Sequence, residues 1–109
     1  MKLTMVRYRV KADRVADNEE ALTKVFAAVE KAKPAGISYA SFKLQDGVSF
    51  VALVHLAGGA SEGGNPLLEL PEFKEFQAGI PDRCIEMPVT EVLDAVGAYN
   101  FFEACGLRA

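Results

Sequence analysis

The residue types best suited to chemistry lie at two places in this sequence: around its only histidine and around residue 83. His55 ends an apolar run, and the strand pairing described below places it beside Ser38 and Phe42. Imidazole changes charge near neutral pH, so a histidine next to a hydroxyl and an apolar wall suits a general base or a group that orients a substrate hydroxyl. The competing interpretation is a half-exposed histidine bonded to Ser38 or to the backbone.

The second group is formed by Asp82, Arg83 and Cys84, which lie between two prolines. Arg83 can hold a carboxylate or an enolate, and Cys84 is a candidate reactive thiol if a cationic neighbour lowers its pKa. Alternatively, Arg83 pairs with a nearby carboxylate and Cys84 is a small buried hydrophobic residue. Tyr8, like Tyr39 and Tyr99, offers a ring and a hydroxyl to an aromatic ligand, although ordinary core packing is expected for at least two of these three tyrosines.

Composition argues against several classes of protein. One histidine and two distant cysteines, Cys84 and Cys105, lack the spacing of a zinc site, so no metal is expected. A net charge of −3 provides no basic surface for nucleic acid. No apolar run approaches the roughly 20 residues that span a bilayer, so no membrane partner is expected. A cytoplasmic location, where thiols stay reduced, is the resulting expectation.

A β-hairpin in the middle of the chain is expected to position the histidine. The pair Asp46–Gly47 predicts a two-residue turn, which places Ser38 opposite His55 and Phe42 opposite Val51. Cross-strand partners share a face of the sheet. This face mixes polar and apolar groups, so we expect it to lie beneath the helices and to line any pocket.

Both faces of the hairpin are apolar, whereas two helices cover only one. Leaving about five large apolar side chains in water forfeits on the order of 10 kcal/mol of burial, which is comparable with the stability of a whole domain. We therefore expect a twofold homodimer in which two sheets face one another. If the two faces are exchanged, dimerisation is still expected, but Tyr39 and Lys43 replace His55 as site candidates.

The remaining elements are predicted from hydrophobic periodicity and from turn residues. In chain order they are a strand (3–10), a helix (13–33), the two hairpin strands, a helical turn (66–70), a helix (71–78), a loop (80–88) and a strand (89–96). This β-α-β-β-α-β order predicts an α+β, ferredoxin-like fold with a four-stranded antiparallel sheet and both helices on one side. We expect one domain over residues 1–102 and a C-terminal tail over 103–109.

Three stretches carry a family pattern: VKADRVADNEEALTKVFAAVEKAKPAGISYASFKLQDGVSFVALVHL, NPLLELPEFKEFQAGIPDRC and VGAYNFF. They resemble the dimeric α+β-barrel superfamily, near uncharacterised proteins of the antibiotic biosynthesis monooxygenase group. The resemblance implies a pocket between the helices and the sheet of each protomer, and an aromatic or polyketide-like substrate. If the chain is an enzyme of this kind, it oxidises its substrate with dioxygen without metal, flavin or other cofactor, and we then expect His55 as the base and Arg83 or a tyrosine to stabilise negative charge.

The better-understood monooxygenases of this superfamily commonly place a tryptophan in the pocket, and this chain has none. Two functions therefore stay open: a cofactor-independent, monooxygenase-like enzyme, or a non-catalytic homodimer that binds a small apolar ligand or takes part in a stress response. The candidate residues are His55 and Arg83 for catalysis and Ser38, Phe42, Cys84 and Tyr8 for substrate binding. A large apolar cavity favours the enzyme, and a closed, well-packed interior favours the second function.

Overall fold

The computed structural model describes residues 2–56 and 66–100 of the 109-residue chain. Its elements are β1 (Lys2–Val10), η1 (Ala12–Arg14), α1 (Val15–Ala32), β2 (Ile37–Lys43), β3 (Ser49–Leu56), η2 (Pro66–Glu69), α3 (Pro71–Arg83) and β4 (Cys84–Leu93). The predicted β-α-β-β-α-β order is confirmed. The expected tail over 103–109 lies outside the described residues.

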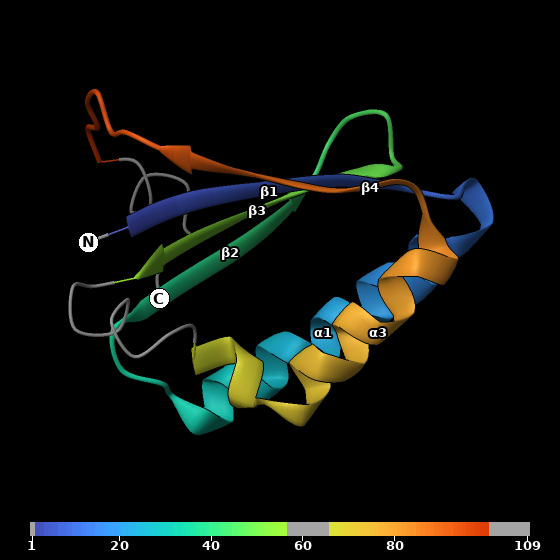
Figure 1. The fold of residues 1–109 in the computed structure, drawn as a ribbon, viewed down its shortest axis with the longest axis horizontal. Helices are drawn as coiled ribbons and strands as arrows, with labels where there is room; N and C mark the ends of the chain where they lie inside the picture. Colours follow the sequence, from blue (N-terminus) through green and yellow to red (C-terminus); the bar gives the residue numbers. More distant parts are fainter. Residues whose placement is uncertain (1, 57–65, 101–109) are drawn as a thin grey trace.

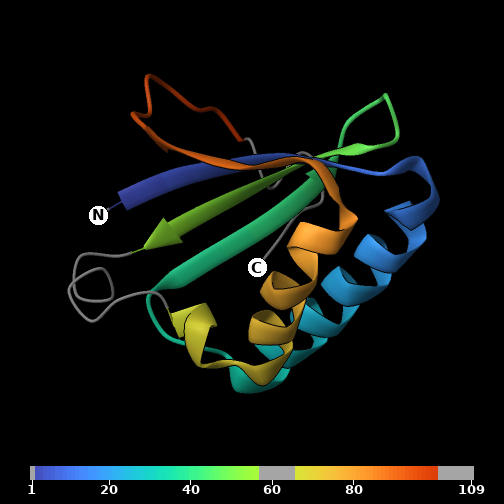
Figure 2. The ribbon, with the colours of Figure 1, turned by 45° about the vertical axis from the view of Figure 1, so that its right-hand side comes forward.

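The four strands form one antiparallel sheet in the order β2-β3-β1-β4, and α1 and α3 lie together on one side of it (Figure 1). The second view shows the same two layers, with none of the described helices on the other side of the sheet (Figure 2). No helix in the described ranges is both long and apolar enough to cross a membrane. Among the described residues, the helices therefore leave one face of the sheet uncovered.

The hairpin between β2 and β3 has the predicted register, with Ser38 opposite His55 and Phe42 opposite Val51. The prediction of which face meets the helices is wrong. Tyr8 of β1 lies opposite Phe50 of β3, and both are buried beneath the helices with their rings stacked 5.5 Å apart. Register puts His55 and its neighbours on the open side.

Arginine in β1 supplies the physical reason for this orientation of the sheet. Arg7 lies opposite Val51 and is exposed, so the face that carries His55 also carries a charge from the neighbouring strand. Burying an unpaired guanidinium under two helices costs several kcal/mol. The face that carries Tyr8 and Phe50 has no such charge at its centre and offers two large rings to the core.

The hairpin turn is wider than the two residues expected. The Leu44 N–H donates to the Ser49 carbonyl at 2.9 Å, and the Gly47 N–H donates to the Leu44 carbonyl at 3.0 Å. Gly47 has a φ of +78°, which favours glycine. The Asp46 carboxylate accepts bonds from the Ser49 hydroxyl and from the backbone N–H groups of Val48 and Ser49, which lower its pKa to about 2. The Asp46 side chain therefore accepts the hydrogen bonds of two N–H groups, those of Val48 and Ser49, that would pair with backbone carbonyls in a tighter turn.

The second long helix continues past the point at which its end was predicted. Phe73, Phe76, Ile80 and Arg83 are buried along one face of α3, at spacings of three and four residues. Packing of this face outweighs the glycine and the Pro81 ring in the last turns, both of which disfavour a helix. The loop expected over 80–88 is absent, because β4 begins directly after α3.

The junction between α3 and β4 is bonded to the end of β1. Val10 pairs with Cys84 in the sheet, and the Lys11 N–H donates to the Arg83 carbonyl at 2.8 Å. The register of β1 with β4 shifts on both sides of Arg9, so the sheet is irregular here. These contacts place Arg83 and Cys84 next to the strand that carries Tyr8.

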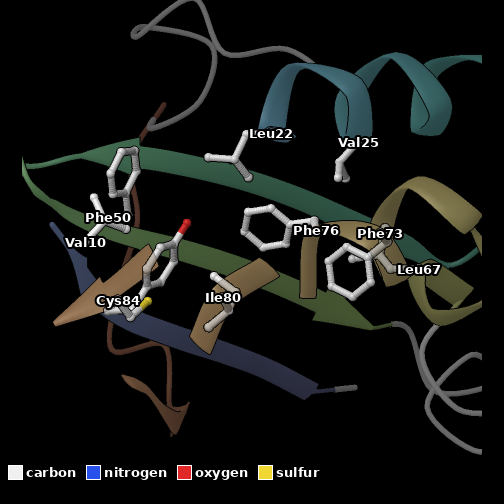
Figure 3. Packing of buried hydrophobic residues seen from close by; sticks show 10 residues of the cluster. Val10, Leu22, Val25, Phe50, Leu67, Phe73, Phe76, Ile80 and Cys84 are labelled. Atoms are coloured by element: carbon white, nitrogen blue, oxygen red, sulfur yellow. The ribbon is translucent and has the colours of Figure 1, made fainter. Parts of the chain in front are cut away.

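The hydrophobic core lies between the sheet and the two helices (Figure 3). Leu22 and Val25 come from α1, Phe73 and Phe76 from α3, and Phe50 from β3. Phe73 and Phe76 lie with ring centroids 6.1 Å apart. Aromatic and aliphatic side chains thus occupy the layer in which a pocket was expected.

Candidate functional site

The most unusual side chain of this core is a buried arginine. Arg83 is 7% exposed at the end of α3, and no carboxylate of the described residues forms an ion pair with it. Its Nε donates to Asn18 Oδ1 at 3.2 Å and its Nη2 donates to the Phe76 carbonyl at 3.0 Å. The guanidinium carbon lies 5.3 Å from the centre of the Phe76 ring. The charge is therefore held by neutral dipoles and a ring, which leaves it available to an anion.

Asn18 links this arginine to the sheet. It lies in α1, is 0% exposed, and donates from Nδ2 to the Tyr8 hydroxyl at 3.0 Å while Oδ1 accepts from Arg83. Tyr8 is 5% exposed. A continuous buried network therefore runs from β1 through α1 to α3. Buried polar networks of this kind stabilise a fold only when every polar group in them is hydrogen-bonded. Each side chain of this network therefore fixes the orientation of the side chain to which it is bonded.

A groove of about 350 Å³ between α1 and α3 gives access to Arg83. Phe76 supplies apolar surface in this groove, and Gly79 lies directly beside the guanidinium. A Cβ atom at position 79 would collide with Arg83 Nη1. Carboxylates from both helices line the same groove, and one of them, Glu20, is paired with Lys24 at 3.7 Å. A ligand that enters here meets one buried cation beneath a mainly acidic surface.

Burial determines the protonation of the neutral groups around Arg83. Desolvation raises the pKa of Tyr8 to about 12, although the hydrogen bond from Asn18 partly opposes the rise. Desolvation also raises the pKa of the Cys84 thiol, and the nearby Arg83 opposes that effect without reversing it. At neutral pH Tyr8 is thus a neutral phenol and Cys84 a thiol. The structure supports Cys84 as a buried hydrophobic residue, because a reactive thiolate requires a lowered pKa.

The structure brings together three of the residues proposed from sequence, Tyr8, Arg83 and Cys84, on the helix side of the sheet. Ser38 and His55 are cross-strand neighbours on the open side, so the expectation that they lie beneath the helices is wrong. The sheet therefore separates His55 from Arg83.

Phe42 is the third residue predicted to lie beneath the helices. It shares the open side with His55 and also borders a second groove, of about 360 Å³, beside β2. An ion pair between Lys43 and Glu19, at 2.9 Å, lies at this second groove. Phe42 thus lies at an edge of the sheet and apart from the buried arginine.

Asn18 is the site residue that sequence reasoning missed. The signal was its position: it falls three residues after Val15 and four before Leu22, on the apolar face of α1. A polar residue at such a position is buried, and a buried amide must find partners. Only the folded structure identifies those partners, because Tyr8 and Arg83 are far from residue 18 in the sequence.

Replacing Tyr8 by phenylalanine is expected to reduce the fall in the free energy of unfolding as the pH rises from 10 to 12. The unfolded tyrosine loses its proton near pH 10.0 and the folded one near pH 12, so between these values the folded state binds more protons and loses stability as pH rises. The loss attributable to Tyr8 is roughly 2 to 3 kcal/mol by pH 12. Urea unfolding at pH 9 to 11.5 measures it, with Tyr99→Phe, at an 89% exposed position, as the control. Equal slopes for the wild type and Tyr8→Phe would contradict the assignment.

Comparison with known proteins supports the fold. No protein-family model matches the chain, and no curated protein matches its sequence. Solved structures do match. A candidate antibiotic biosynthesis monooxygenase from Caulobacter crescentus CB15 is 23% identical, with a TM-score of 0.67, over 88% of this chain and 90% of that one. A second candidate of that group, from Nitrosomonas europaea, is 15% identical with a TM-score of 0.70, over 89% and 100%.

A third solved structure adds a named activity for a protein with this fold. SnoaB from Streptomyces nogalater, a cofactor-independent oxygenase, is 19% identical with a TM-score of 0.63, over 89% of this chain and 95% of that one. At such low identity the likeness establishes the fold and leaves the chemistry open. The chain thus has the ferredoxin-like α+β fold of the antibiotic biosynthesis monooxygenase proteins.

Proposed function

We propose that this protein binds a small aromatic or polyketide-like molecule through an anionic oxygen at Arg83 and oxidises it with dioxygen, without a cofactor. The observation that carries the proposal is the buried guanidinium that lacks a carboxylate partner among the described residues. Such a charge costs several kcal/mol to bury, so an arrangement that keeps it unpaired is best explained by a ligand anion. The similarity in fold to a cofactor-independent oxygenase supports the second half of the proposal.

The chemistry assigned to the site is stabilisation of a substrate enolate or phenolate. The buried guanidinium favours the anion over the neutral substrate, and the carbanion then transfers electrons to dioxygen. In the overall reaction an activated CH₂ group loses two hydrogens and gains one oxygen atom as a carbonyl, while the second oxygen atom leaves as water. Arg83 is assigned the electrostatic role, and Tyr8 acts through Asn18 to hold it. His55 has no part in this site, because it lies across the sheet.

The assembly we propose is a homodimer joined through the open face of the sheet. Leu53, at the centre of this face, lies opposite Met5 of β1 and Ala40 of β2. Val89 of β4, which lies opposite Arg7 on this face, is more than half exposed. Apolar surface of this extent on a small protein typically marks an interface. A second copy, sheet facing sheet, covers it and leaves the groove between α1 and α3 on the outside of the dimer.

The alternative function is binding without catalysis, and one observation favours it. The layer between sheet and helices is occupied by the core, including Phe50, Phe73 and Phe76, so the groove at Arg83 is a surface feature with solvent access. Oxygenation of a carbanion benefits from a site that excludes water. A protein that only binds its ligand has no such requirement.

Replacing Arg83 by methionine is expected to lower turnover about 100-fold or more and to weaken binding of an anionic aromatic ligand, because the charge that stabilises the anion is removed. Methionine fills a similar volume, so the core is preserved. The assay is dioxygen uptake with an anthrone-type activated methylene compound, together with calorimetric binding. Lys74→Met, on the exposed side of α3, is the matched control for loss of one positive charge. Binding without dioxygen uptake would select the non-catalytic function, and unchanged behaviour of Arg83→Met would exclude both.

A further inference from the structure

We infer that Asn18 is a positioning residue whose amide keeps the charge of Arg83 unpaired and directed to the groove, so that the site selects anions. This inference rests on the proposed function and concerns a residue that touches no ligand. Asn18 lies behind the guanidinium, between Nε of Arg83 and the Tyr8 hydroxyl, whereas Nη1 lies beside Gly79 in the groove.

The choice of an amide at position 18 is informative because a carboxylate would satisfy the same contacts. One oxygen of an aspartate can accept from Arg83 Nε as Oδ1 does now. The other oxygen can accept a hydrogen bond from the Tyr8 hydroxyl. In the present contact with Asn18, that hydroxyl is the acceptor. That arrangement pairs a buried cation with a buried anion: the bond to Arg83 then joins two opposite charges, and the bond to Tyr8 becomes charge-assisted as well. Local stability therefore favours Asp at this position.

The surrounding sequence makes the amide more significant. Residues 17 to 20 read Asp, Asn, Glu, Glu, so the only member of this run without a negative charge is the one that contacts the arginine. Asp17 is exposed and bonded to Arg14 at 2.7 Å. The neighbouring carboxylates thus have partners at the surface or face solvent, and none of them pairs with Arg83. The buried charge remains available to a ligand from outside.

The neutral amide of Asn18 beside Arg83 predicts which ligands bind. An anion gains a charge-assisted bond to Nη1 that a neutral molecule of the same shape does not gain. With aspartate at position 18, the guanidinium already has its counter-charge, and a second anion gains much less from it. We therefore expect an aromatic carboxylate such as 2-naphthoate to bind the wild-type protein more tightly than its neutral amide, 2-naphthamide.

The test is Asn18→Asp in the full-length protein, with both probes measured by calorimetry. We expect the affinity for 2-naphthoate to fall about 10- to 100-fold, the difference that one charge-assisted bond makes, and the affinity for 2-naphthamide to stay the same. Asn18→Asp is expected to unfold at a higher urea concentration than Asn18→Leu, because leucine removes the hydrogen bonds to both Arg83 and Tyr8. Gln77→Glu adds the same charge at an exposed position of α3 and is expected to bind as the wild type does.

Each outcome decides the matter. If Asn18→Asp folds and binds 2-naphthoate as tightly as the wild type, Asn18 has only a structural role and the inference is overturned while the proposed function stands. If Asn18→Asp does not fold, the carboxylate does not pair with Arg83 and the inference is likewise overturned. If the wild-type protein binds neither probe, the proposed function fails together with the inference.

Discussion

Replacing Leu53 by glutamate is expected to convert a dimer into a monomer. Leu53 lies at the centre of the open sheet face, with Met5 and Ala40 as its cross-strand neighbours. In a face-to-face dimer the substitution buries two carboxylates, one from each protomer, and a buried unpaired charge costs several kcal/mol. At 1.4 kcal/mol for each factor of ten, the dissociation constant rises by about three orders of magnitude or more.

Light scattering during size-exclusion chromatography at micromolar concentration measures this effect. The wild-type protein is expected at twice the chain mass of 11.8 kDa and the variant at the chain mass. Ala27→Glu, at an exposed position of α1, introduces the same charge away from the face and is expected to remain dimeric. If the protein does not dimerise through this face, Leu53→Glu leaves the measured mass the same as that of the wild type. That result would refute the dimer.

Replacing Gly79 by alanine is expected to dislodge Arg83 and so to lower both stability and ligand binding. Alanine is favoured over glycine inside a helix by about 1 kcal/mol. The three nearest atoms to a Cβ at this position all belong to the guanidinium group, and one of them, Nη1, is in collision. The guanidinium has to shift, which weakens or breaks the bonds to Asn18 and to the Phe76 carbonyl, each worth about 1.5 to 3 kcal/mol because the donor is charged.

The sign of this effect is expected to reverse when the arginine is absent. In an Arg83→Met background the obstacle is gone, and Gly79→Ala then adds up to about 1 kcal/mol of stability through helix propensity. A double-mutant cycle by urea unfolding, with 2-naphthoate binding as the second readout, measures the coupling. Stabilisation by Gly79→Ala in both backgrounds would show that Arg83 is not held against the helix at this glycine.

The fold was predictable because its local signals agree with the tertiary structure. The hairpin register followed from Asp46 and Gly47, even though the turn proved wider, and it placed Tyr39 and His55 on opposite faces. The apolar spacing of Phe73 and Phe76 predicted the buried face of α3. The end of that helix was less predictable, because packing of residues beyond it outweighed a glycine and a proline that normally end helices.

The site was much less predictable, because it depends on which strands are neighbours. Arg83 was a candidate from its chemistry, but its partners Asn18 and Tyr8 lie on two other elements. The face of the hairpin that meets the helices depended on the register between β1 and β3, which puts Arg7 on the same side as His55. No local pattern in the hairpin contains that information.

The sequence by itself determined the order of elements, the pairing of the hairpin and the presence of two apolar sheet faces, since these depend on alternation and on turn residues within a few positions. Only the tertiary structure decided which face the helices cover and that Arg83 is bonded to Asn18 and to no carboxylate of the described residues. The reason is energetic: burial of a charge is settled by the sum of contacts from β1, α1 and α3, and that sum exists only once the chain has folded.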